Sequence, residues 1–338
     1  MPRPNILYIH SHDTGRYVQP YGHAIPTPHL QRLAEEGVLF RRAFSAAPTC
    51  SPSRAALLTG QAPHSGGMLG LAHRGFALAD YGQHLVHILR GVGYTSTLIG
   101  VQHVARNPAI IGYDRVVDLP HNRAAAVAPA AAAFLRDAPA APFFLDVGFF
   151  ETHREFPLAG DSRYCLPPPT LPDIPATRAD MAAFGASARV LDGGIGAVLD
   201  ALDATGLARN TLVICTTDHG LAFPGMKCTL TDNGIGVMLI LRGPGGFTGG
   251  RVCDALVSQL DLFPTLCDLA AIAPPRWLQG RSLLPLIRDE CDEINDAIFA
   301  EVTYHAAYEP QRAIRTARWN IYPPLRDAQP TGAPQLRR

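Results

Sequence analysis

The sequence predicts an α/β protein with a doubly wound, mostly parallel sheet that is flanked by helices. Short apolar runs typical of buried strands alternate along the chain with segments typical of helices, and this order favours parallel strands. The 338 residues, 47% of them hydrophobic, suffice for one large domain or two smaller ones. We expect a main α/β domain over residues 1–275, a small, truncated α+β subdomain over 276–322, and a disordered tail over 323–338.

The expected strands of the main sheet are apolar runs that end in polar residues. The clearest run, over residues 142–150, is nearly continuous in apolar residues, as in strands covered on both faces. The other runs span residues 5–10, 40–44, 94–99, 211–215 and 237–241. The C-terminal subdomain is expected to contain strands at 297–303 and 313–322.

The helices are expected between these strands, where proline, serine and glycine mark their ends. Thr27-Pro28 opens one helix that ends at Gly37, and Ser258 caps another over 260–269. A helix over 123–135 is expected to break near Pro129, because proline removes a helical hydrogen bond. The remaining expectations are helices over 80–89 and 178–204, the latter weakened by Gly193, Gly194 and Gly196, and an irregular proline-rich loop over 157–175.

Charge and cysteine content argue against several classes of protein. The formal net charge is zero, so no global field directs the protein to nucleic acid or to an anionic membrane. No apolar run approaches about 20 residues, so no membrane span is expected. The seven cysteines are odd in number and lack a CxxC pair, which argues against a disulfide framework. The N-terminus lacks the pattern of a signal peptide, so we expect a cytoplasmic protein.

The stretch Cys50-Ser51-Pro52-Ser53-Arg54 has the pattern of a helix N-terminus. Pro52 suits the first turn of a helix, and Gly60 suits the residue just after its end. Cys50 would then lie where free N–H groups favour an anion, with Arg54 one turn away on the same face. This arrangement suits an activated nucleophile or a bound oxyanion. The alternative is a buried structural cysteine before an ordinary helix.

Four expected strands are followed by polar residues that favour a shared site. These residues are His12-Asp13, His103, His153 and Asp218-His219. Because parallel strands end at one edge of a sheet, we expect these side chains to converge with Cys50. Each of them alone is also compatible with a capped turn or a hydrogen-bonded histidine.

The residue types at these positions suit transfer of an anionic group. Asp13, Asp218 and His219 offer ligands for one divalent cation, which would neutralise charge on a sulfuryl or phosphoryl oxygen. Cations and proton donors for such a transition state are available from Arg54, Lys227, His103 and His153.

The Cys50 stretch, followed by Leu57-Leu58-Thr59-Gly60, resembles the signature of the sulfatases in the alkaline-phosphatase-like superfamily. The resemblance extends over residues 5–320. It includes Asn5 to Asp13, Thr27 to Leu30, Gly37 to Phe44, Gly93 to His103, Pro142 to His153, Thr217 to Gly220, and Lys227. Gly66-Gly67-Met68 and the short loops are most similar to the heparan N-sulfatase branch.

The resemblance implies a chemistry and a set of residue roles. Cys50 would be oxidised to formylglycine by a formylglycine-generating enzyme, and the protein would hydrolyse a sulfuric ester or sulfamate of a small molecule or saccharide. One divalent ion, Ca²⁺ by family and otherwise Mn²⁺, Mg²⁺ or Zn²⁺, would bind Asp13, Asp218, His219 and the converted Cys50. Arg54 and Lys227 would hold the formylglycine and sulfate, His103 would assist the formylglycine hydrate, and His153 would contact the sulfate or leaving group.

Three features depart from the family pattern. His12 stands where the family usually has Asp; as a ligand it would favour Mn²⁺ or Zn²⁺ over Ca²⁺, and otherwise Asp13 alone serves. Val101 stands where the family usually has Lys. The chain is also shorter than is usual in the family. His305 and Arg312, near its C-terminal end, are expected either to reach the mouth of the pocket or to lie on the surface. Two alternatives therefore remain: a phosphonate monoester or phosphodiester hydrolase on the same scaffold, and a weakly active or non-catalytic anion-binding relative.

Overall fold

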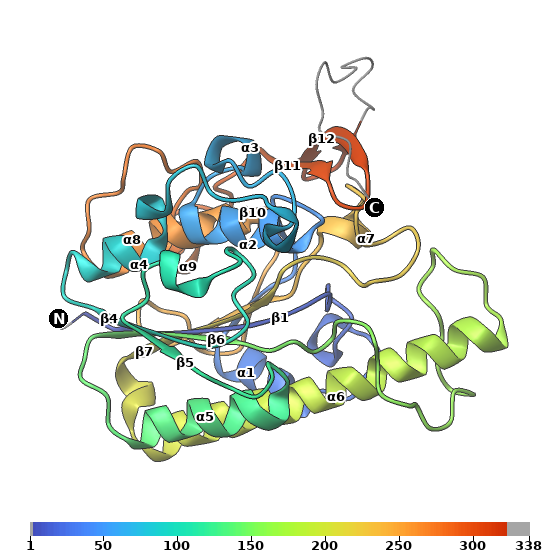
Figure 1. Ribbon diagram of the computed structural model, residues 1–338, viewed down its shortest axis with the longest axis horizontal. Helices are drawn as coiled ribbons and strands as arrows, with labels where there is room; N and C mark the ends of the chain where they lie inside the picture. The colour runs from blue at the N-terminus through green and yellow to red at the C-terminus, as the bar shows by residue number, and fades with distance from the viewer. Residues whose placement is uncertain (1–2, 323–338) are drawn as a thin grey trace.

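A computed structural model describes residues 3–322 and confirms the predicted α/β class; the tail predicted over 323–338 lies outside the described residues (Figure 1). Its main feature is an eight-stranded sheet in the order β5-β4-β6-β1-β7-β8-β2-β9. The strands are β1 (Asn5–Ser11), β2 (Val38–Phe40), β4 (Thr95–Gly100), β5 (Arg115–Val117), β6 (Phe143–Gly148), β7 (Thr211–Thr217), β8 (Leu239–Arg242) and β9 (Arg251–Cys253).

Most pairings in this sheet are parallel. Strand β1 lies between β6 and β7 and is parallel to both. Strand β8 is antiparallel to its neighbours β7 and β2, so the sheet is mixed, with its parallel part running from β5 to β7. The parallel part therefore brings the carboxyl ends of β4, β6, β1 and β7 together at one edge.

Helices cover both faces of the sheet (Figure 1). They are α1 (Pro28–Glu36), α2 (Cys50–Thr59), α3 (Pro63–Gly66), α4 (Leu85–Arg90), α5 (Ala124–Arg136), α6 (Pro175–Ala204), α7 (Asp232–Ile235), α8 (Leu262–Leu269), α9 (Leu284–Ile287) and the 3₁₀ turns 19–21, 72–74, 81–83, 108–110, 207–210 and 259–261. Helices α2, α4, α8 and α9 pack on one face, and α1, α5 and α6 pack on the other.

The alternation of side chains along β1 divides the core between these two faces. Ile6 and Tyr8 belong to the cluster that contains Leu57 and Leu58 of α2, whereas Leu7 and Ile9 belong to the cluster beneath α5 and α6. Because both faces are covered, β1 is buried along its whole length, as its continuous apolar run predicts.

Helix α5 is continuous, so the predicted break near Pro129 is wrong. Pro129 lies on the exposed side of the helix, and so does Ala125, whose carbonyl group loses the N–H partner that proline lacks. Val127 and Ala128 are buried against the sheet and hold the helix in place.

Helix α6 also runs unbroken through its glycines. A Cβ atom at Gly196 would lie 2.5 Å from the ring of His29, and one at Gly194 would lie 3.0 Å from Phe149. These glycines therefore allow close packing, which offsets their low helix propensity. By length and composition α6 also resembles a membrane span, but 61% of its apolar window is buried against the rest of the protein, as in a core helix.

The helix predicted over 80–89 is two separate pieces. A 3₁₀ turn over Tyr81–Gln83 precedes α4, and between them His84 is extended, with φ −68° and ψ 141°. The His84 side chain accepts a hydrogen bond from the Val86 backbone, so it caps α4 and fixes where the helix begins.

The C-terminal segment forms a small antiparallel sheet of β11 (Ala297–Tyr304), β12 (Tyr308–Thr316) and β13 (Asn320–Ile321). A further two-stranded sheet pairs β3 (Ala43–Phe44) with β10 (Val257–Ser258). The backbone N–H of Glu301 donates to Ala46, and that of Tyr304 donates to Leu69. The small sheet is thereby docked on the segments that precede and follow α2.

Candidate active site

Cys50 is the first residue of helix α2, as the sequence predicts. Gly60 follows the helix in the left-handed conformation, with φ 68°, and its N–H donates to Ala56. Every residue of α2 is buried, and Cys50 is 2% exposed. Burial raises the pKa of the Cys50 thiol, so the unmodified side chain is a poor nucleophile at neutral pH.

The predicted strand-end residues converge on Cys50. The Sγ atom of Cys50 lies 3.2 Å from Nε2 of His219, which follows β7. The ring of His12, after β1, lies 5.7 Å from that of His103 and 5.5 Å from that of His153. Asp13 and His103 both have positive φ, 51° and 58°, which is unusual for residues other than glycine and is frequent at functional sites.

Two aspartates form the floor of the site. The backbone N–H of Asp13 donates to Oδ1 of Asp218 over 2.8 Å, so the first carboxylate is positioned by the second. Lys227 donates to both carboxylate oxygens of Asp13, at 2.9 and 3.0 Å. Arg54 donates to Oδ2 of Asp218 at 3.0 Å and to the carbonyl oxygen of Ser11 at 2.7 Å.

The arrangement fits a divalent cation. One ligand atom from each of His12, Asp13, Cys50 and Asp218 lies within 4.8 Å of the others. His219 donates from Nδ1 to the carbonyl oxygen of Gly220, so its Nε2 carries a lone pair and faces Oδ1 of Asp13 at 3.3 Å. Two acceptors at that separation repel each other unless a cation lies between them. The donor set of carboxylates and imidazoles suits Mn²⁺, Zn²⁺, Mg²⁺ or Ca²⁺.

The charges of the buried groups are set by their neighbours. Burial alone would raise the pKa of Asp218, but His219, Arg54 and His12 lower it well below its usual range. Burial and Arg54 lower the pKa of His103 to about 3 and that of His12 well below its normal value. The aspartate is therefore ionised and the imidazoles are neutral, which is the state that binds a metal ion.

A chain of buried groups behind Arg54 was not predicted from the sequence. One nitrogen of His10 is hydrogen-bonded to Arg54, and its Nε2 lies 2.8 Å from Oδ1 of Asp146. The other oxygen of Asp146 accepts from the hydroxyl of Tyr113. These residues lie inside strands or in a loop, away from any motif; the only signals in the sequence are a histidine within β1 and an aspartate within β6.

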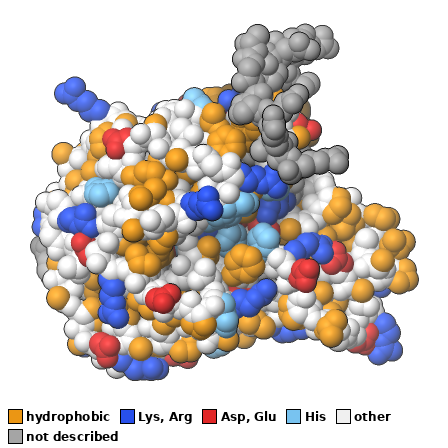
Figure 2. All heavy atoms as spheres, in the orientation of Figure 1, with side chains coloured by type: hydrophobic (Ala, Val, Ile, Leu, Met, Phe, Trp, Pro, Cys, Tyr) orange, Lys and Arg blue, Asp and Glu red, His pale blue; other side chains and the backbone are white. Residues whose placement is uncertain are grey.

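Histidines and cations gather near the middle of one face of the molecule (Figure 2). Nε2 of His103 lies 3.1 Å from Nδ1 of His73, a residue that no sequence motif marks. Burial, with smaller effects of Lys227 and His219, lowers the pKa of His305 to about 4. Arg312 instead pairs with Glu301 at 2.7 Å within the C-terminal sheet.

The site therefore combines a cysteine at a helix N-terminus with paired aspartates at the edge of the sheet, as the resemblance to the sulfatases implies. A profile of the sulfatases matches residues 4–272, and one of the C-terminal part of N-sulphoglucosamine sulphohydrolase matches residues 226–327. The chain belongs to the sulfatase family. It is therefore a hydrolase of sulfuric esters or sulfamates, and its sequence lies near the heparan N-sulfatase branch, as the resemblance implies.

Individual relatives agree with this assignment. Human N-sulphoglucosamine sulphohydrolase is 33% identical and aligns over 89% of this chain and 69% of its own length. An ulvan-active sulfatase of Formosa agariphila is 28% identical over 83% of this chain, which spans 54% of that relative.

Solved structures share the fold. A 2-O GAG sulfatase superposes with a TM-score of 0.80 at 25% identity, covering 95% of this chain and 82% of its own. A phosphonate monoester hydrolase of Silicibacter pomeroyi superposes with a TM-score of 0.75 at 21% identity, covering 95% and 87%.

Proposed function

We propose that this sulfatase acts through a formylglycine made from Cys50 and through one divalent metal ion. The observation that supports this is the convergence of Cys50, Asp13 and Asp218 with Lys227 and Arg54 at one edge of the sheet. Since the Cys50 thiol is buried with a raised pKa, conversion to an aldehyde hydrate would supply the nucleophilic oxygen that the thiol does not.

In this proposal Asp13, Asp218, His219 and the converted residue 50 hold the ion, with His12 as a further ligand. A divalent ion so bound neutralises charge on a sulfuryl oxygen and favours ionisation of the attacking hydroxyl. The family resemblance favours Ca²⁺, whereas imidazole at position 12 favours Mn²⁺ or Zn²⁺ over Ca²⁺.

The remaining residues act on charge and protons. Arg54, fixed by Asp218 and Ser11, holds the nucleophile in place, and Lys227 offers its ammonium group to a sulfate above Asp13. The rings of His103 and His153 lie 5.7 and 5.5 Å from that of His12 and are suited to hold or return the protons of the nucleophile and of the leaving group. Because position 101 is valine and not lysine, Lys227 has to balance more of the negative charge on the sulfate.

For the substrate we propose a sulfated saccharide or a related small molecule, because the named relatives act on such compounds. A formylglycine-generating enzyme is the maturation partner that the proposal requires. A cytoplasmic location stays a prediction.

Mass spectrometry of the peptide that contains Cys50, from protein made in its native host, tests the proposal. We expect the aldehyde or its hydrate at residue 50, and we expect chelation to abolish turnover of an aryl sulfate. An unmodified thiol in fully active protein would show the mechanism to be wrong.

A second candidate activity is hydrolysis of phosphonate monoesters or phosphodiesters. The phosphonate monoester hydrolase fold superposes over nearly the whole chain, and His12 and Val101 both depart from the sulfatase pattern. Comparing aryl sulfate and aryl phosphonate turnover in one preparation separates the two. If neither is turned over and no divalent ion binds, the chain is a non-catalytic relative.

A further inference from the structure

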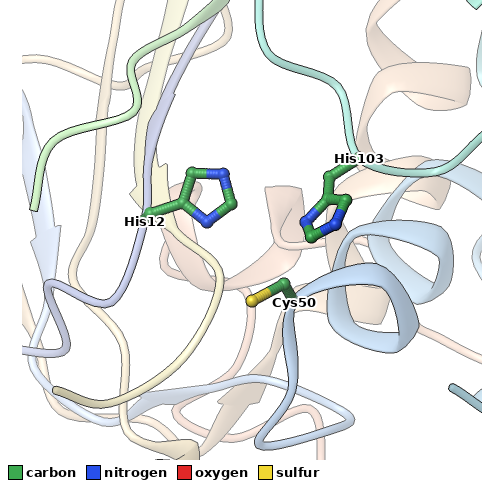
Figure 3. Close-up of side chains that lie close together, drawn as sticks. All are labelled: His12, Cys50 and His103. Atoms are coloured by element: carbon green, nitrogen blue, oxygen red, sulfur yellow. The ribbon is translucent and has the colours of Figure 1, made fainter. Parts of the chain in front are cut away.

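A second cluster of ligand atoms overlaps the acidic one. One ligand atom from each of His12, Cys50 and His103 lies within 4.8 Å of the others. Figure 3 shows the three side chains facing one another across the site, from the end of β1, the start of α2 and the loop after β4. This cluster contains a sulfur and two imidazoles and no carboxylate.

The two imidazoles are free to bind an ion. Among the described residues, Nε2 of His12 and Nδ1 of His103 have no hydrogen-bond partner, although both atoms are buried. Nδ1 of His12 lies 3.1 Å from Oδ2 of Asp218, and Nε2 of His103 lies 3.1 Å from His73. Outer partners of this kind orient histidine ligands in metal sites.

The ligand types select the ion. A thiolate with two imidazoles suits Zn²⁺ and similar thiophilic cations, whereas Ca²⁺ and Mg²⁺ prefer oxygen ligands. Nε2 of His219 lies 3.2 Å from Sγ of Cys50 but is not part of the cluster, so the fourth position of a tetrahedral ion is left to water. Because Cys50 and His12 belong to both clusters, the thiophilic ion and the ion of the acidic site exclude each other.

We propose that the unconverted protein, with a thiol at residue 50, binds one zinc-type cation through His12, Cys50 and His103. As the sulfur–metal bond forms, the thiol releases its proton to water, so one proton leaves for each ion bound. Conversion of Cys50 to formylglycine removes the sulfur and with it this site. The inference concerns only the thiol form, so it does not depend on the proposed function of the converted enzyme.

Cobalt substitution tests the proposal on full-length protein made in a host without the maturation enzyme. Intact mass first confirms the thiol. We expect one equivalent of Co²⁺ with a thiolate-to-cobalt charge-transfer band and tetrahedral d–d bands, and we expect Zn²⁺ to displace it. Stoichiometric Co²⁺ without the charge-transfer band, or no bound ion, would overturn the proposal.

Three variants sharpen the assignment. Cys50→Ser should lose the charge-transfer band. His103→Asn, chosen because asparagine tolerates positive φ, should bind more than about 100-fold more weakly, since losing only an outer partner of a ligand costs about 10–100-fold. His153→Gln removes a neighbouring imidazole outside the cluster and should bind as the parent does. Unchanged affinity in a folded His103→Asn variant, checked by circular dichroism, would contradict the role of His103.

Discussion

Nε2 of His10 lies 2.8 Å from Oδ1 of Asp146, and both side chains are buried behind Arg54. The Arg54 guanidinium can only donate hydrogen bonds, so the nitrogen of His10 that faces it accepts, and Nε2 donates to Asp146. This fixes one tautomer of His10. It also fixes the orientation in which Arg54 meets Asp218.

Replacing His10 tests this positioning role. His10→Leu removes the acceptor that Arg54 uses, so we expect kcat/KM for an aryl sulfate to fall by roughly 10–100-fold, as for other partners of site residues. His10→Asn restores a carbonyl oxygen near the position of Nδ1 and should recover much of the loss. If both variants are folded and equally impaired, the hydrogen bond to Arg54 is not what His10 contributes.

Asp218→Asn should abolish activity and bound metal together. The asparagine oxygen still accepts from the backbone N–H groups of Asp13 and His219, whereas Asp218→Ala would leave these donors unpaired as well as Arg54 and reduce stability further. Elemental analysis and turnover are measured on the same sample, and thermal unfolding checks the fold. A variant that keeps most of its turnover would contradict the assignment of Asp218 as a metal ligand.

His84 should make the protein less stable in acid. Burial lowers the pKa of His84 from 6.5 to about 3 in the folded protein. As the pH falls from 6.5 towards 3, the unfolded chain therefore binds a proton that the folded protein does not, and the free energy of unfolding decreases; above pH 6.5 this loss is absent. Between pH 7 and pH 5 this amounts to about 2 kcal/mol. Urea unfolding of His84→Asn, which keeps the cap of α4, should show a correspondingly flatter pH dependence. If the variant and the parent have the same pH dependence, the pKa of His84 is not lowered in the folded protein.

Glu301→Gln should loosen the C-terminal sheet. The buried Glu301 carboxylate accepts from the His64 ring at 2.7 Å and from Arg312 at 2.7 Å, and removing the charge of such an acceptor costs about 1.5–3 kcal/mol. Chemical denaturation measures the loss. The matched control is Asp289→Asn, which breaks an exposed pair with Arg251 and should cost less than about 1 kcal/mol. Equal effects would show that Glu301 does not anchor the sheet.

The sequence predicted the part of the site that depends on sheet geometry. Residues that follow parallel strands meet at one edge whatever the details of packing, so the order of the strands was enough to place His12, His103 and Asp218 near Cys50. Lys227 lies in a loop, so sheet geometry did not place it; its charge and the family resemblance pointed to it.

Features that depend on strand register or on close packing were not predictable. His10 stands opposite Gly148 in β6, where a Cβ atom would lie 2.7 Å from the His10 ring, so its place behind Arg54 depends on a register that no local pattern states. The continuity of α5 likewise depends on which side of the helix Pro129 occupies, and that is set by tertiary packing.

Cys50 and His219 lie far apart along the chain, and this separation bears on when Cys50 can be converted to formylglycine. Cys50 is 2% exposed in the folded protein, and its neighbour His219 is synthesised 169 residues later. At about 5–20 residues per second, a ribosome needs roughly 10–30 seconds to cover that interval. During this interval the nascent chain presents Cys50 before β7 exists to enclose it, so the conversion that we propose is expected before the chain folds around Cys50.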